Sequence, residues 1–237
     1  MIWPMRLFCA FLIFFGTLCS VYADGYVKYV RKLLPVAEGT DFYMESIYGH
    51  ITLHQWEKDS VLVEASFQVE RAEDWEKEEL AGQLDLLVET WPGTINIRTQ
   101  VAEEFEQAGS LLVETVLWVP KGMVMDLVGR YSFIYVPAFV VCEHTSLTAI
   151  YGDIRIDSLQ SVNDREIYLN VSYGKLLVDC CSKALIRSSY SSVDIDKASF
   201  LQIKAEKSQI EVQAADTLIS EGKYNVYRVK KKRIDDF

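Results

Sequence analysis

Apolar and polar residues alternate along the second half of the chain in a pattern that repeats every 17 to 22 residues. Each copy is centred on a tyrosine or, once, a lysine: Tyr131, Tyr151, Tyr173, Tyr190, Lys207 and Tyr224. The third and fifth residues after each centre are apolar: Ile134 and Val136, Ile154 and Ile156, Leu176 and Val178, Val193 and Ile195, Ile210 and Val212, Tyr227 and Val229. The residue between them is mostly polar, so the period is two, which predicts a strand with one inward face.

A second strand precedes each centre. The inward position four residues upstream is apolar in all but the last copy: Leu127, Leu147, Leu169, Ile186, Ile203 and Ser220. Directly after the centre come small residues that tolerate a tight bend: Ser132, Gly152, Gly174, Ser191, Ser208 and Asn225. Each copy therefore predicts a strand, a corner, a strand and a turn.

A unit of this size, with two short strands, buries its apolar face only by stacking on the next copy. We therefore predict an all-β fold in which residues 120–229 form a parallel β-helix, a solenoid of about six coils. Parallel crossovers are nearly always right-handed, so we expect a right-handed coil. Equivalent residues of successive coils should lie above one another, about 4.8 Å apart.

The region before residue 120 is rich in predicted strands but less regular. Its segment Tyr48-Gly49-His50-Ile51-Thr52-Leu53 follows the same columns as the later repeats. Residues 72–82 are acidic and helix-prone, with Gly82 as the expected C-terminal stop. We expect residues 24–119 to form an irregular β-rich region with one short helix that caps the solenoid, and residues 230–237 to form a charged tail.

The order of these segments resembles a known family. The residues that carry the resemblance are Ile47 to Leu53, Gln55 to Val61, Val119-Pro120-Lys121-Gly122 and the tyrosine-centred repeats. Together they are similar to the bacterial putative-adhesin family, exported β-strand-repeat proteins common in Bacteroidetes. The resemblance spans residues 33–229 and implies export and a β-helix-like fold, but it supplies no catalytic motif. The chain departs from the family pattern at Lys207 and in the irregular copy from Val119 to Phe139.

Residues 1–23 have the composition of a secretory signal peptide. Arg6 is their only charge, an apolar core runs from Leu7 to Leu18, and small Ala23 precedes Asp24. An uncleaved anchor and lipidation at Cys19 are the alternatives, although bulky Leu18 stands where a small residue is expected before a lipidated cysteine. We expect an exported protein of the periplasm, cell surface or extracellular space, with no membrane insertion after cleavage.

Charge and cysteine content narrow the function classes. The net charge of −10 argues against nucleic acid or an anionic membrane surface as a partner. Cys142 and Cys181 share a column but lie two coils apart, roughly 9–10 Å, which is beyond disulfide reach. We expect Cys142, Cys180 and Cys181 to be small buried residues, with a Cys180 to Cys181 bridge or a reactive thiol as the alternatives.

No recognised catalytic or cofactor-binding motif occurs in the sequence. His50, His54 and His144 are the only histidines, and their spacing fits no metal site. The tyrosine column shares the inward parity of the preceding strand, so we expect a packed aromatic ladder that fixes the register. The alternative is an aromatic row that stacks on sugar rings.

One acidic column is chemically unusual. Asp157, Asp179 and Asp196 each lie six residues after a tyrosine, in three consecutive coils. Aspartates at these strand ends are expected to form turns; the alternative is a weak divalent-cation site or a strip that contacts a glycan. We expect no other metal site and no cofactor.

These observations favour a non-catalytic, adhesin-like protein of the cell envelope. Its β-helix would present a surface to a glycan or an envelope protein. The alternative is a carbohydrate-active enzyme, a polysaccharide lyase or hydrolase, that uses stacked carboxylates on the β-helix. The basic residues from Arg228 to Arg233 are expected to protect the open end of the sheet from adding another chain.

Overall fold

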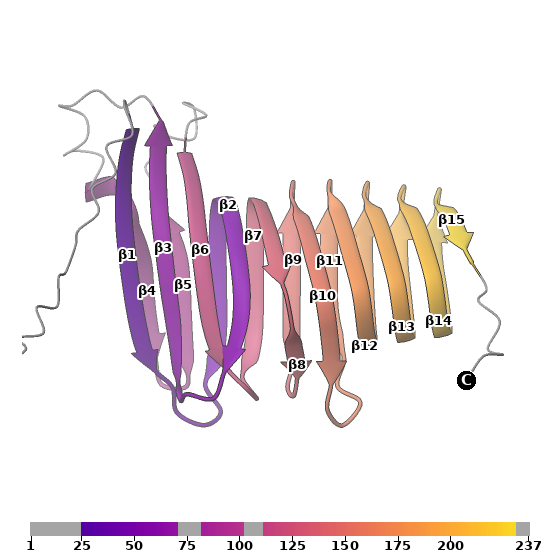
Figure 1. Ribbon diagram of the computed structural model, residues 1–237, viewed down its shortest axis with the longest axis horizontal. Helices are drawn as coiled ribbons and strands as arrows, with labels where there is room; N and C mark the ends of the chain where they lie inside the picture. The colour runs from indigo at the N-terminus through magenta and orange to yellow at the C-terminus, as the bar shows by residue number, and fades with distance from the viewer. Residues whose placement is uncertain (1–24, 71–81, 102–110, 231–237) are drawn as a thin grey trace, which may run out of the picture.

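The computed structural model describes residues 25–70, 82–101 and 111–230, and these are almost entirely β-strand (Figure 1). The strands are β1 (Gly25–Pro35), β2 (Asp41–Trp56), β3 (Ser60–Glu70), β4 (Asp85–Trp91), β5 (Thr94–Gln100), β6 (Leu111–Pro120), β7 (Val124–Val136), β8 (Phe139–Val141), β9 (Thr145–Ile150), β10 (Asp153–Ser161), β11 (Ile167–Ser172), β12 (Lys175–Ser189), β13 (Ser192–Glu206), β14 (Gln209–Lys223) and β15 (Val226–Val229). The predicted signal peptide, most of the predicted helix at 72–82 and the tail beyond residue 230 lie outside the described residues. No helix of the described part is long and apolar enough to cross a membrane.

The second half of the chain is a parallel β-solenoid in the predicted register. After the corner, Ile134 pairs with Ile154 and Ile154 with Leu176. The same column continues through β13, β14 and β15. Before the corner, Leu127 pairs with Leu147, which pairs in turn with Leu169. The six corners from Tyr131 to Tyr224 are separated by five complete turns. The short strand β15 begins a further coil and does not complete it.

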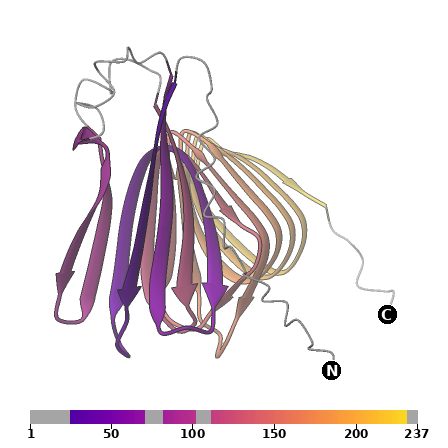
Figure 2. The same ribbon diagram turned by 60° about the vertical axis from the view of Figure 1, so that its left-hand side comes forward.

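The parallel stack begins earlier in the chain, at β2. Residues of β2 pair in register with β7 on both sides of the corner, for example Met44 with Leu127 and Ile51 with Ile134. The strands that lie between β2 and β7 in sequence extend both sides of the parallel stack beyond β2 (Figure 2). Strand β6 adds to the second half of β2, followed by β3 and β1 as antiparallel strands. Strand β5 adds to the first half of β2 and forms a hairpin with β4.

A continuous apolar core runs through the solenoid. The inward residues of successive coils are fully buried, including Ile134, Ile154 and Leu176. Their outward neighbours in the same strands are partly exposed, as the burial pattern of β10 shows. The predicted inward columns are therefore confirmed as far as Val212, and the core follows the axis of the stack. In the last copy Ser220, Tyr227 and Val229 are exposed, so its predicted inward positions do not join the core.

Each corner is made by the tyrosine itself. The backbone φ angle at the repeat centres lies between 50° and 60°, the left-handed region that side chains other than glycine rarely adopt. The bend thus lies one residue earlier than predicted. The following glycine is needed for another reason: a Cβ on Gly152 would lie 2.0 Å from the carbonyl oxygen of Ser132, and one on Gly174 would lie 1.8 Å from that of Gly152. Close backbone approach between coils selects glycine there.

Candidate functional site

The corners bring five tyrosine rings into a single stack along the solenoid. We call this stack the tyrosine ladder: Tyr48, Tyr131, Tyr151, Tyr173 and Tyr190. Neighbouring ring centroids are 5.4, 5.2, 4.9 and 5.1 Å apart, and the ring planes differ by 7° to 17°. These distances follow the spacing of parallel strands, so the rings are held in register by the backbone beneath them.

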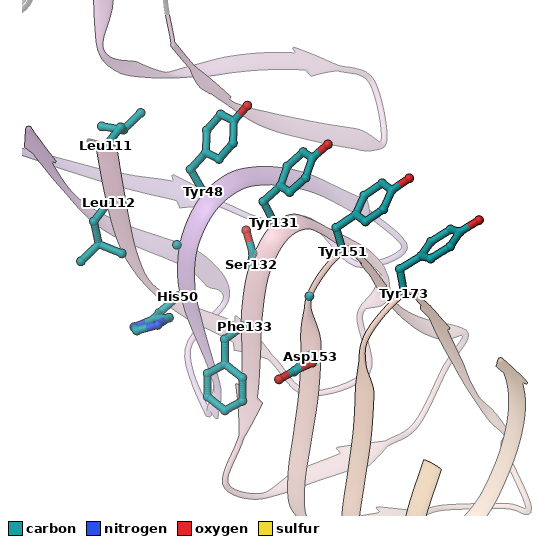
Figure 3. A pocket seen from close by; sticks show the side chains of 12 residues that line it. Tyr48, His50, Leu111, Leu112, Tyr131, Ser132, Phe133, Tyr151, Asp153 and Tyr173 are labelled. Carbon is teal, nitrogen blue, oxygen red and sulfur yellow. The ribbon is translucent and has the colours of Figure 1, made fainter. Parts of the chain in front are cut away.

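The ladder was predicted, but its direction was not. The alternation of the preceding strand placed the tyrosines inward, whereas the tyrosine residues from Tyr131 to Tyr190 are 45% to 53% exposed. The left-handed φ at each tyrosine turns its side chain out of the alternating pattern. Ring faces contact each other, and ring edges and hydroxyl groups face solvent (Figure 3).

A lysine ends the ladder on its C-terminal side. The Nζ atom of Lys207 lies 4.7 Å from the centroid of the Tyr190 ring and donates a hydrogen bond of 2.6 Å to the Tyr190 hydroxyl. This hydrogen bond raises the pKa of Lys207. The sequence repeat has a lysine here in place of a tyrosine. The structure shows that this lysine places its positive charge over the exposed face of the last ring.

An open groove of about 470 Å³ borders the first four rings of the ladder. Gly49, Ser132 and Gly152 line it beside the rings, together with Phe133 and Asp153. Leu111 and Leu112 of β6 stand at its N-terminal end, beside Tyr48 (Figure 3). The groove thus combines aromatic edges, phenol hydroxyls, small residues and two leucines, and we call it the ladder groove.

The described polar groups of the ladder groove include one carboxylate and one histidine. Asp153 is the only carboxylate in the described lining, and its Oδ1 atom accepts a hydrogen bond of 2.8 Å from the backbone N–H of Lys175. His50 packs edge-on against Phe133, with centroids 5.9 Å apart. Hydrolysis of a glycosidic bond normally needs two carboxyl groups that flank that bond, and the described lining provides one.

Two aspartates of the acidic column are bound by one arginine. Arg155 donates hydrogen bonds to Asp157 at 3.0 Å and to Asp179 at 2.9 Å, so its guanidinium lies where a shared cation was considered. Tyr135 donates a hydrogen bond of 2.5 Å to Asp157, which raises the pKa of the Tyr135 hydroxyl. Asp196 is exposed. Within the described residues, no group of three or more histidine, cysteine, aspartate or glutamate side chains could hold a metal ion.

A second cluster of charges, near the C-terminal end of the stack, was not predicted. Asp194 and Glu211 face each other on adjacent coils. Burial and the nearby carboxylate of Glu211 raise the pKa of Asp194. Burial acts on Glu211 in the same direction, but hydrogen bonds from Gln213 and Lys230 outweigh it and the pKa of Glu211 is lowered. Only the stacking of the coils brings these groups together, since they are 17 residues apart in sequence.

The described cysteines and the other two histidines lie outside the ladder groove. The three described cysteines are free thiols. Cys181 is buried as expected, which raises its pKa to about 12, whereas Cys180 is exposed. His54 stacks on Trp118 at 4.3 Å, and His144 lies 3.6 Å from the carboxylate of Asp126.

Comparisons with known proteins concern the architecture. No family model and no curated protein sequence matches the chain. A putative adhesin from Bacteroides fragilis is similar in structure, with 11% identity and a TM-score of 0.49 over 86% of this chain and 96% of that one. A putative adhesin from Parabacteroides distasonis has 13% identity and a TM-score of 0.44 over 86% of this chain and 94% of that one. A putative lipid binding protein from the same species has 12% identity and a TM-score of 0.42 over 89% of this chain and 98% of that one. The two adhesins carry the name of the family that the sequence resembles, and at these values we take neither an activity nor a partner from any of the three.

Proposed function

We propose that the protein is an exported, non-catalytic, adhesin-like protein that binds an envelope or extracellular partner on the tyrosine ladder and the ladder groove. The observation that carries this proposal is the row of rings, half-exposed from Tyr131 to Tyr190, that borders an open groove on a regular solenoid. Aromatic side chains are enriched at protein interfaces because they offer a large contact area.

The ladder is already arranged for binding before any partner arrives. Each ring is fixed by its stacked neighbours, and the backbone of each coil is hydrogen-bonded to the next, as in the bond from the Tyr151 N–H to the Ser172 carbonyl. A partner would therefore bind without ordering these side chains, which removes a large part of the usual entropic cost.

The geometry gives less support to the enzymatic alternative. The stacked carboxylates of Asp157 and Asp179 are bound by Arg155, and one carboxylate lies among the described residues of the ladder groove. A glycoside hydrolase needs a pair that can act as acid and as base or nucleophile.

A retention assay tests the proposal. The purified protein is incubated with envelope fractions, sedimented and quantified, beside the variant Tyr151→Asn, because asparagine tolerates the left-handed backbone but removes the ring. We expect Tyr151→Asn to reduce retention while Tyr29→Asn, at an exposed tyrosine of β1 outside the ladder, does not. Equal retention of both variants would contradict the proposed site, and turnover in a polysaccharide screen would contradict a non-catalytic role.

Export has a separate test. Mass spectrometry of protein recovered from the periplasm or the medium should find an N-terminus at Asp24, because the sequence places the cleavage site after Ala23. Full-length protein confined to the cytoplasm would contradict export.

A further inference from the structure

We infer that the ligand of the ladder groove is a neutral, linear polysaccharide of β-1,4-linked pyranoses, bound lengthwise along the solenoid axis. This inference rests on the proposed function and adds the chemical class of the partner and its orientation.

The spacing of the ladder carries the first step. Hydroxyl groups project from the same edge of successive rings (Figure 3), and ring centroids repeat every 4.9 to 5.4 Å along the stack. This repeat is close to the advance of one pyranose in an extended β-1,4-linked chain, so each coil would meet one sugar. Because successive sugars are turned over, neighbouring coils would meet hydroxyls from opposite edges of the pyranose. An extended peptide advances about 3.3 Å per residue, or about 6.7 Å between side chains on one face, and falls out of step within two coils.

The groups that the ladder presents to a ligand carry the second step. Because the ring faces are stacked on each other, a planar base has no free face to insert against between Tyr131 and Tyr173. The ladder instead presents phenol hydroxyls, which both donate and accept hydrogen bonds. A chain of sugar hydroxyls satisfies these groups, and its C–H groups can contact Leu111, Leu112 and the ring edges. A bare alkyl chain would leave the hydroxyls without partners, which is unfavourable once they lose contact with water.

Charge selects a neutral chain. Asp153 is the only carboxylate among the described residues that line the ladder groove, and the whole protein carries a formal charge of −10. A polyuronate or sulfated glycan would be repelled by this field, whereas a neutral glycan is not.

The length of the ladder predicts how affinity depends on chain length. Five rings define four intervals, a length of about 20 Å at one strand spacing per coil. Each sugar adds weak contacts of the same kind, so affinity should rise steeply from the disaccharide and level off near five or six sugars.

The experiment is calorimetric titration of the full protein with cello- and chito-oligosaccharides of two to six sugars. The matched variant is the double substitution Tyr131→Phe with Tyr151→Phe, which keeps the stacked rings and removes two hydroxyls. In the described structure no side chain hydrogen-bonds the Tyr151 hydroxyl, so the fold should tolerate this change. Thermal melting of the variant verifies that it is folded, and Tyr29→Phe is the control outside the ladder.

We expect the wild type to bind the hexasaccharides more tightly than the disaccharides. The double variant should bind about 4- to 100-fold more weakly, since each lost hydrogen bond reduces affinity by about 2- to 10-fold. Failure of the wild type to bind either hexasaccharide, equal affinity for two and six sugars, or unchanged binding by the folded double variant would overturn the inference. If envelope retention still depends on Tyr151 while the oligosaccharides do not bind, the glycan inference fails and the proposed function stands.

Discussion

Replacing Tyr151 by alanine and by glycine should give an inverted order of stability. Tyr151 lies between Tyr131 and Tyr173 in the ladder, with its backbone at a φ of 55°. Alanine keeps the unfavourable left-handed conformation, whereas glycine adopts it readily. We therefore expect Tyr151→Gly to be more stable than Tyr151→Ala, although glycine is normally the more destabilising of the two within a regular strand.

The size of the effect follows from the contacts of the ring. Two stacked pairs contribute about 0.5–1.5 kcal/mol each, and burying about half of the ring contributes roughly 2 kcal/mol at about 25 cal/mol per Å². Alanine should thus lower the free energy of unfolding by about 3–5 kcal/mol. Glycine relieves about 1–2 kcal/mol of left-handed strain and loses about 0.5–1 kcal/mol to the greater freedom of the unfolded chain. The glycine variant should be more stable than the alanine variant by about 1 kcal/mol.

Urea-induced unfolding followed by circular dichroism measures this difference. Equal slopes against urea for the variants would show that the same surface becomes exposed on unfolding. Tyr29→Ala is the matched control, because that ring is 79% exposed and should contribute less than about 0.5 kcal/mol. An alanine variant at least as stable as the glycine variant would refute the assignment of the bend to the tyrosine.

Three further substitutions test the core and the charges. Ile154→Asp places an unpaired charge in the core and should abolish folding; soluble protein that melts cooperatively would show that Ile154 does not point inward. Arg155→Met leaves Asp157 and Asp179 without their shared cation, and should lower the free energy of unfolding by about 1 kcal/mol at low salt and less at high salt; an effect independent of salt would count against the ion pairs. The pKa of Asp194 in the folded protein lies above its ordinary 3.8. The free energy of unfolding therefore falls as the pH rises from 3.8 through this raised pKa. Asp194→Asn should therefore raise the melting temperature at pH 7, and the gain should disappear as the pH falls towards 3.8; a gain that grows on acidification would contradict the raised pKa.

The register of the solenoid was predictable because the inward columns tolerate only apolar residues. Shifting any strand by one residue would move Ile154 or Leu176 to the surface, so the alternation alone determines which residues pair. The direction of the tyrosines was not predictable in the same way. Alternation holds only while the backbone stays extended, and a single left-handed residue reverses it. The small residues after each tyrosine looked like the bend, whereas Gly152 serves the close approach of neighbouring coils.

The site itself depends on contacts that sequence patterns do not contain. The ladder groove brings together β2, β6 and β7, because the chain leaves the stack after β2 and returns to it at β7. The aspartate column was visible in the sequence, but the contact of Arg155 with Asp179 depends on the reach of a long side chain to the adjacent coil. Repeat spacing thus predicted which residues stack, and the structure was needed to place the partners of their side chains.

A crystal structure of the protein soaked with cellohexaose would test the central claim most directly. The account predicts a sugar chain parallel to the solenoid axis, with one sugar per coil and sugar hydroxyls within hydrogen-bond distance of Tyr131, Tyr151 and Tyr173. A chain that crosses the coils, or one bound on another face with the ladder groove left open, would contradict it.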